Sequence, residues 1–298
     1  MLKSAYSSHG QWYSIDELNS YDASQAAGTS ESGLSFYGGA LGSKFAPPRP
    51  RVEPRMDTRE QEELVNGRKV VMPKRPPRGN ECYALDKQLA AAGPQEALEL
   101  AMRSAELMDA PNWANLLYAL AHCKKKGGLS NVALLLEDQR WSQSCRRLQA
   151  SLADLTARDT ANVVWSLATL DAKQEALFLE AAEALCQKLA VCDPVSISKV
   201  AWALTSIPNR DRRLELYAKL AVPVVLRADS FPLGSLTMIS YSFGKADFRD
   251  CEAYEALSSA LTGHMNQELR PIDVCNVVWS FCTVGYRDDL LFDKICEL

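Results

Sequence analysis

The hydrophobic pattern divides the chain near residue 81. Beyond that point alanine and leucine recur at the spacing of one helix face, as in ALDKQLAAAG and EALELAMRSAELM, whereas residues 1–80 show no sustained periodicity. Apolar positions that recur every three or four residues place one face of a helix against a core. The pattern therefore predicts an all-α fold for residues 81–298.

The helical pattern is also repeated. Similar apolar strings with a central aromatic residue occur as NWANLLYALAHC (112–123), DTANVVWSLATL (159–170), SISKVAWALTSI (196–207), SLTMISYSFGKA (235–246) and DVCNVVWSFCTV (273–284). The aromatic residues, called anchors below, are Tyr118, Trp165, Trp202, Tyr241 and Trp279, so three of the four intervals lie close to 38 residues and the first is 47. Helical units with a period of roughly 20–50 residues stack into solenoids. We therefore predict an α–α superhelix, a solenoid of helical hairpins about 38 residues long.

Each repeat is expected to contain an anchor helix and an amphipathic partner helix. An earlier hairpin without an anchor covers 81–108, and the following units are 109–155, 156–192, 193–229, 230–269 and 270–298. The long first interval contains KKKGGLSN, which is expected to be an extra loop. The last unit stops inside its second helix, so the chain is expected to be a fragment or to lack a C-terminal cap.

Helix-start signals recur ahead of the anchors. Asp109, Thr156 and Asp193 lie nine residues before their anchors, and a further polar residue follows three positions later in each case. Such pairs suit a capping residue and its reciprocal partner, because side-chain oxygens accept hydrogen bonds from the free N–H groups of the first turn. The fourth and fifth repeats lack a good capping residue at that position.

On a helical wheel, small residues flank each anchor. They are Ala114, Ala161, Ser198, Thr237 and Cys275 four positions before it, and Ala121, Ala168, Thr205, Gly244 and Cys282 three positions after it. Small residues beside a large ring let a neighbouring helix approach closely while the ring fills the space between the helices. The anchors are therefore expected to be core residues rather than platforms on which bases stack.

A third, mostly polar face lies one turn from the anchors. It carries Asn115, Asn162, Lys199, Met238 and Asn276 three positions before the anchor, and His122, Thr169, Ser206, Lys245 and Thr283 four positions after it. In parallel stacked repeats these side chains would form a ladder along the inner surface. Helical-repeat proteins read single-stranded RNA with two or three side chains per base. An ordinary solvated face, or the surface of a peptide-binding scaffold, would show the same pattern.

Basic residues near the first anchor helix extend this face. Lys124, Lys125 and Lys126 follow that helix and are candidates for phosphate contacts, with solvated surface charge as the equal alternative. Arg140, Arg146 and Arg147 on its partner helix fit solvated surface charge better.

The N-terminal 80 residues differ in composition from the rest. They hold 8 of the 15 Gly and 7 of the 14 Pro, and are expected to form a disordered tail. The extreme N-terminus suits an organelle transit region as well as it suits an ordinary tail. The formal charge of the whole chain is −4, which excludes a simple polycationic nucleic-acid coat. Residues 81–298 alone carry −6, and no apolar stretch is long enough to cross a membrane.

Catalytic and metal-binding signatures are missing from the sequence. The nine Cys include no C-x-x-C pair, and the three His are far apart. No glycine-rich phosphate loop or nucleophile elbow occurs. His122 and Cys123 are adjacent, but neighbouring residues on a helix point about 100° apart. The sequence therefore predicts a protein that is not an enzyme and that uses no metal or other cofactor.

The strings ANVVWSLATL and CNVVWSFCTVG, at their spacing, resemble the octotricopeptide repeat of algal, apicomplexan and dinoflagellate organelle proteins. The array is also similar to the helical repeats beside FAST-kinase-like and RAP domains, and to the domain named for the trypanosomatid RNA-editing substrate-binding complex. The resemblance covers residues 109–298. It implies binding of organellar RNA in transcript processing, stability, splicing or translation, together with other RNA-processing proteins. The implied location is a mitochondrion or plastid, with the cytoplasm left open, and an α-solenoid scaffold for protein partners is the alternative function.

Overall fold

The computed structural model describes residues 4–6, 12–14, 62–65, 68–71, 78–129, 131–264 and 269–297. It divides the chain into two units, Met1–Lys74 and Arg75–Leu298. Each unit is considered by itself.

The described part of the first unit consists of two antiparallel strand pairs. Strand β1 (Ser4–Tyr6) pairs with β2 (Trp12–Ser14), and β3 (Glu62–Val65) pairs with β4 (Arg68–Val71). Both pairs lie in the segment for which a disordered tail is expected. In the sequence, Asn66-Gly67, a dipeptide typical of short hairpins, separates β3 from β4. The disorder expected for the rest of the tail concerns residues outside the described ones.

The second unit confirms the all-α prediction. Its α-helices are α2 (Asn80–Ala91), α3 (Pro94–Arg103), α4 (Ala110–Lys125), α5 (Val132–Glu137), α6 (Gln139–Ala150), α7 (Ala157–Leu170), α8 (Glu175–Cys186), α9 (Pro194–Leu204), α10 (Arg210–Arg227), α11 (Leu233–Ala246), α12 (Cys251–His264), α13 (Pro271–Val284) and α14 (Asp289–Cys296). Short 3-10 turns join them at η1 (Leu152–Asp154), η2 (Leu189–Val191) and η3 (Ala228–Ser230).

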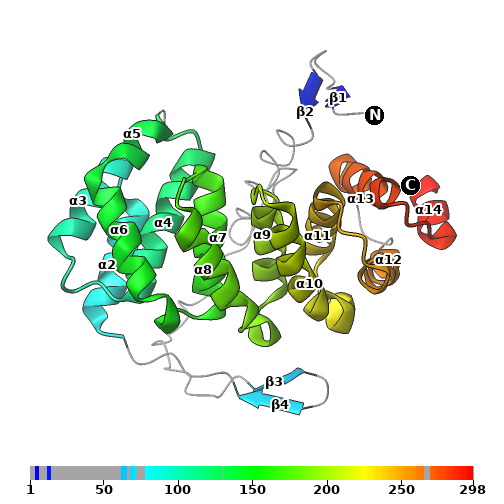
Figure 1. Cartoon of the computed structure of the whole chain (residues 1–298), viewed down its shortest axis with the longest axis horizontal. Helices are drawn as coiled ribbons and strands as arrows, with labels where there is room; N and C mark the ends of the chain where they lie inside the picture. Colours follow the sequence, from blue (N-terminus) through cyan, green and yellow to red (C-terminus); the bar gives the residue numbers. More distant parts are fainter. Residues whose placement is uncertain are drawn as a thin grey trace, which may run out of the picture. The chain divides into compact units, whose positions relative to one another are not determined.

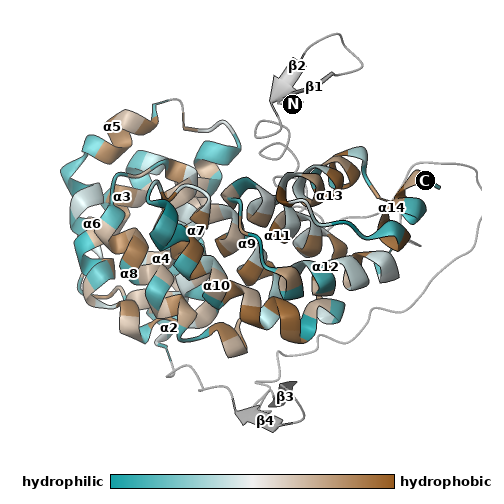
Figure 2. Ribbon diagram, turned by 45° about the vertical axis from the view of Figure 1, so that its right-hand side comes forward, coloured by the Kyte–Doolittle hydropathy of each residue, from teal (hydrophilic) through white to brown (hydrophobic). Residues whose placement is uncertain are grey.

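The helices form an α-helical, repeat-like arrangement (Figure 1). The anchor helices α4, α7, α9, α11 and α13 each pack against the next in that order. The partner helices α6, α8, α10, α12 and α14 make a second series of consecutive contacts. Hydrophobic and hydrophilic residues share each helix, as expected where one face packs on a neighbour (Figure 2).

The first interval departs from the expected form. Helix α5 begins at Val132, directly after the expected extra loop KKKGGLSN (124–131), and adds a short helix to this interval. Helix α4 runs through Lys125, with Lys126 as its C-cap, so Lys124 and Lys125 belong to the helix rather than following it. The two lysines therefore have fixed directions on the last turn of α4.

The predicted helix starts are confirmed. Asp109 caps α4 by accepting a hydrogen bond from the Asn112 N–H at 2.9 Å. The Asn112 Oδ1 accepts in turn from the Asp109 N–H at 3.1 Å, which completes a capping box. Thr156 and Asp159 form the same box on α7, and Asp193 caps α9. The equivalent residues of α11 and α13 make no side-chain cap, as the sequence indicated.

The small residues beside the anchors allow close packing of the anchor helices. Ala114 and Ala161 are buried, and Gly244 is buried where α11 meets α13. A Cβ atom on Gly244 would lie 2.7 Å from both Cα and Cβ of Ser280. The anchor Trp165 is 7% exposed and Tyr241 is buried, whereas Tyr118, Trp202 and Trp279 are half-buried and keep an edge near the surface.

Candidate nucleic-acid interface

Polar side chains from consecutive anchor helices meet around one lysine. Lys199 on α9 donates a hydrogen bond from Nζ to Asn162 Oδ1 on α7, at 3.1 Å. The same ammonium group lies 3.2 Å from the Tyr118 hydroxyl on α4. A side chain of α9 thus reaches across α7 to α4, which brings three repeats together at one place.

This place is defined here as the lysine–aromatic cluster: Tyr118, His122, Lys125, Trp165 and Lys199. Lys199 Nζ lies 4.9 Å from the centre of the Tyr118 ring and 5.8 Å from that of Trp165. Lys125 Nζ lies 5.5 Å from the centre of the Trp165 ring. The His122 ring packs on both aromatic rings, with centroid distances of 4.4 Å to Tyr118 and 5.1 Å to Trp165. Ammonium groups over ring faces are held by the negative potential of the rings.

The cluster carries positive charge that no carboxylate of the described residues neutralises. Among the residues that the structure describes, no carboxylate lies within ion-pair distance of Lys125 or Lys199. Burial and the charge of Lys199 lower the pKa of Lys125 to about 8. Burial, followed by the charges of Lys199, Lys125 and Lys126, lowers the pKa of His122 to about 4. His122 is therefore neutral near pH 7, and the lysines provide the charge.

The other two lysines of the predicted run behave differently from Lys125. Lys124 Nζ donates a hydrogen bond to the Thr169 carbonyl oxygen at 2.7 Å and so ties the end of α4 to α7. Lys126 is exposed. Thr169 Oγ1 is buried and finds no hydrogen-bond partner among the residues that the structure describes. Of the run, only Lys125 joins the cluster directly.

Asn115 lies in a different network, at the start of the helical unit. Its amide nitrogen donates to Asp86 Oδ1 on α2, at 2.7 Å. The same carboxylate oxygen accepts from Asn112, and Arg78 bridges Asp86 to Asp109. These contacts hold the first hairpin on α4, so the Asn115 amide nitrogen already donates a hydrogen bond within the protein.

The remaining predicted residues are not brought together with the cluster. Ser206 and Thr283 are exposed; the Ser206 hydroxyl, in the turn after α9, donates to the Ala203 carbonyl oxygen, and the Thr283 hydroxyl donates to the Trp279 carbonyl oxygen within α13. Lys245 is exposed and lies 5.7 Å from the centre of the Tyr241 ring. Asn276 is 4% exposed, and is therefore closed off rather than presented on a solvated edge.

The anchors are core residues as predicted, since Trp165 belongs to the hydrophobic core and Tyr118 packs against it. Ammonium groups also lie over both rings. This second contact was not predicted, because Lys199 lies over the rings of the two preceding repeats, which its own repeat does not indicate.

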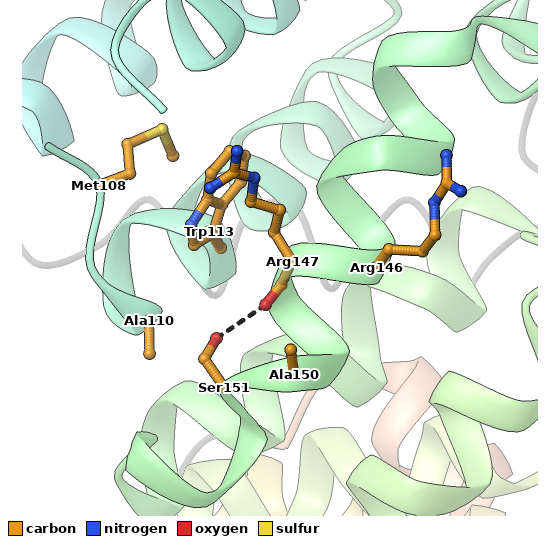
Figure 3. A pocket seen from close by; sticks show the side chains of 7 residues that line it. All are labelled: Met108, Ala110, Trp113, Arg146, Arg147, Ala150 and Ser151. Carbon is orange, nitrogen blue, oxygen red and sulfur yellow. Dashed lines mark hydrogen bonds between the residues drawn. The ribbon is translucent and has the colours of Figure 1, made fainter. Parts of the chain in front are cut away.

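A separate pocket opens beside α4 and α6 (Figure 3). The Arg147 guanidinium lies 6.0 Å from the Trp113 ring centre and pairs with Glu106 at 3.3 Å. Ser151 donates to the Arg147 carbonyl oxygen at 3.0 Å. The lining residues are Met108, Ala110, Trp113, Arg146, Arg147, Ala150 and Ser151. Arg146 and Arg147 are exposed, which agrees with the expected solvated surface charge.

Among the described residues, no group of His, Cys, Asp and Glu side chains is placed to bind a metal ion. No helix in the same residues combines the length and apolar character needed to cross a bilayer.

Comparison with known proteins identifies no relative. No protein-family model matches the chain, and no curated protein matches it at a significant level.

Proposed function

We propose that the protein binds single-stranded RNA on the surface formed by its anchor helices. The observation that carries this proposal is the lysine–aromatic cluster, where half-buried ammonium groups from two repeats meet without a carboxylate among the described residues. Phosphate groups are the usual partners of such lysines in nucleic-acid binders. The exposed Ser206 hydroxyl in the turn after α9 and the exposed Thr283 hydroxyl on α13 offer acceptor oxygens to bases.

Local charge, rather than the overall field, would have to attract the RNA. Residues 81–298 carry a net charge of −6, so long-range steering is unfavourable. Four lysines on the anchor helices or at their ends would contact the phosphates: Lys125, Lys126, Lys199 and Lys245. Each phosphate neutralised on a single strand changes the slope of log K against log salt by about −0.7, so we expect a slope no steeper than about −3.

The anchor rings would support the lysines rather than stack on bases. Trp165 is 7% exposed and is covered by His122, Tyr118 and the two ammonium groups. Base recognition would then depend on hydrogen bonds, as in helical-repeat proteins that read base edges.

The resemblance to octotricopeptide repeats supports a more specific role. In that role the protein acts in transcript processing, stability, splicing or translation in a mitochondrion or plastid, as a binding protein without catalysis of its own. A fusion of residues 1–80 to a fluorescent reporter tests the location. Import of the reporter into an organelle supports it, and a reporter that stays in the cytosol contradicts it.

Fluorescence anisotropy tests the binding directly. A labelled 20-nucleotide single-stranded RNA is titrated with the full chain at 50 and 200 mM salt, with duplex RNA of the same sequence as competitor. We expect binding that weakens by at most about 50-fold between the two salt concentrations, given the slope above. The absence of salt-dependent binding, or preference for the duplex, contradicts the proposal.

A protein-interaction scaffold remains the second candidate, because one partner helix exposes apolar side chains. Val222, Val225 and Leu226 on α10 are 55%, 36% and 54% exposed. Residues spaced by three and four positions share one helix side and form a patch that suits another protein. Affinity capture after nuclease treatment, repeated with Leu226→Asp, tests this function. A partner retained by the native chain and lost with the variant favours the scaffold.

A further inference from the structure

We propose that Lys125 and Lys199 together form an anion site that holds one phosphate group between α4 and α9. The inference rests on the proposed function in taking that phosphate to be a phosphodiester of single-stranded RNA. The same chemistry would accept free phosphate or pyrophosphate, and the experiment below separates these sources.

Geometry brings the two ammonium groups to the same ring. Their Nζ atoms lie 5.5 and 5.8 Å from the centre of the Trp165 indole, although they come from α4 and α9, the anchor helices on the two sides of α7. The Tyr118 hydroxyl and Asn162 Oδ1 fix Lys199. The site is therefore built by three helices rather than by loose surface side chains.

Unused hydrogen-bonding capacity points to a ligand. An ammonium group has three donors. Lys125 is half-buried and, within the part of the chain that the structure describes, its Nζ donates no hydrogen bond and forms no ion pair. Withdrawing a charged group from water without such partners is unfavourable, and two like charges at one place add repulsion. A bound anion would supply acceptors to Lys125 and cancel the repulsion.

Phosphate suits this arrangement better than a carboxylate does. A phosphodiester presents two non-bridging oxygens within a repeating chain of charges, and lysines bind phosphates as point charges. The site offers ammonium groups on two separate helices and no arginine fork of the kind that favours a carboxylate. An acidic peptide is retained as an outcome of the test.

The charged surroundings predict how binding depends on pH. Lys199 on α9 is the charged group that acts on Lys125, His122 on α4 feels Lys125, Lys199 and Lys126, and α7 contributes the uncharged Trp165. The pKa of Lys125 is about 8 in the free protein, so the group loses its charge as the pH rises above that value. A bound phosphate would raise this pKa, so the complex takes up a proton, and affinity falls between pH 7.5 and pH 9.5.

Lysine labelling tests the site with two probes. The full chain is treated with an amine-acylating reagent at pH 8, alone, with inorganic pyrophosphate, or with a 12-nucleotide oligouridylate, at matched ionic strength. Mass spectrometry then measures the labelling rate at each lysine. We expect both probes to slow labelling of Lys125 and Lys199 at least fivefold, with no effect on the exposed Lys87 of α2 and Lys219 of α10.

Paired variants provide the second measurement. Lys125→Gln/Lys199→Gln should weaken oligouridylate binding at least tenfold, while the charge-matched Lys87→Gln/Lys219→Gln leaves it unchanged. Thermal melting followed by circular dichroism verifies that both variants are folded. If folding of the first pair is impaired, the labelling result on the native chain decides.

The results of labelling and of RNA binding test the anion site and the RNA-binding function separately. If RNA binds but neither lysine is protected, the anion site is wrong and the proposed function stands. If pyrophosphate protects both lysines and RNA does not bind, the site stands for free phosphate and the RNA function is wrong. If neither probe protects the lysines and RNA does not bind, both the site and the function are wrong. Stronger protection by polyglutamate than by either phosphate probe overturns the choice of phosphate.

Discussion

Replacing Gly244 by alanine tests how closely the anchor helices stack. The added Cβ would lie 2.7 Å from Cα and Cβ of Ser280, about 0.7 Å inside ordinary van der Waals contact. The nearest atoms belong to the α13 backbone and its first side-chain atom, so no flexible group can move aside. Overpacking of this kind costs about 1–3 kcal/mol of stability. Alanine also favours a helix over glycine by about 1 kcal/mol, which offsets part of the loss.

A second glycine of the same helix supplies the control. Gly234 also lies in α11, and a Cβ there meets no atom within 4 Å. The difference between Gly244→Ala and Gly234→Ala isolates the contact, and we expect about 1–3 kcal/mol in the free energy of unfolding. Urea unfolding followed by circular dichroism measures it, and hydrogen exchange at α11 and α13 locates the loss. Equal stability of the two variants would refute the close approach of these helices.

Substitutions at three further positions test the packing, the caps and the electrostatics. Trp165→Ala should lower the free energy of unfolding by about 3–5 kcal/mol, because the ring is nearly buried, and a loss below about 1 kcal/mol in urea titrations contradicts that placement. Thr156→Ala should cost about 0.5–2 kcal/mol through the lost cap of α7, whereas Thr156→Ser, which keeps the hydroxyl, should restore most of it; equal losses would show that the cap is unimportant. His122 has a pKa of about 4 in the folded protein against 6.5 ordinarily, so the unfolded chain binds the extra proton between these values and stability falls as the pH drops from 6.5 to 4. His122→Gln should flatten that decline in thermal melts, and an unchanged profile would assign the decline to other groups.

The helical part of the fold was largely predictable because its signals are local. Asp109, Thr156 and Asp193 mark the starts of α4, α7 and α9, since capping depends on residues three apart in sequence. The small residue Gly244, three positions after the anchor Tyr241, likewise indicated that a neighbouring helix packs closely there. The caps and the small residues both lie at fixed distances from the anchors, so each could be found from the repeat alone.

Other elements were not predicted because they are short and have only weak local signals in the sequence. Helix α5 was missed because its six residues, Val132–Glu137, are too few to show a helical period. The composition of the tail gives no sign of the short strands β3 and β4, and the Asn-Gly dipeptide between them is the one local hairpin signal there.

The geometry of the candidate site was only partly predictable. Lys199 and Asn162 occupy equivalent positions of successive repeats, and their contact follows from the expected ladder. The contact of Lys199 with Tyr118 joins residues 81 positions apart and depends on how α4, α7 and α9 pack in three dimensions. Periodicity also could not show that Asn276, at an equivalent position, is buried.

The most direct test of the central claim is to locate the RNA on the protein. A single-stranded RNA containing 4-thiouridine is crosslinked to the full chain, and mass spectrometry identifies the crosslinked residues. The account predicts crosslinks on the anchor helices α4, α7 and α9, concentrated around the lysine–aromatic cluster. Crosslinks confined to the partner helices α6, α8, α10 and α12 would contradict it, as would the absence of any specific crosslink.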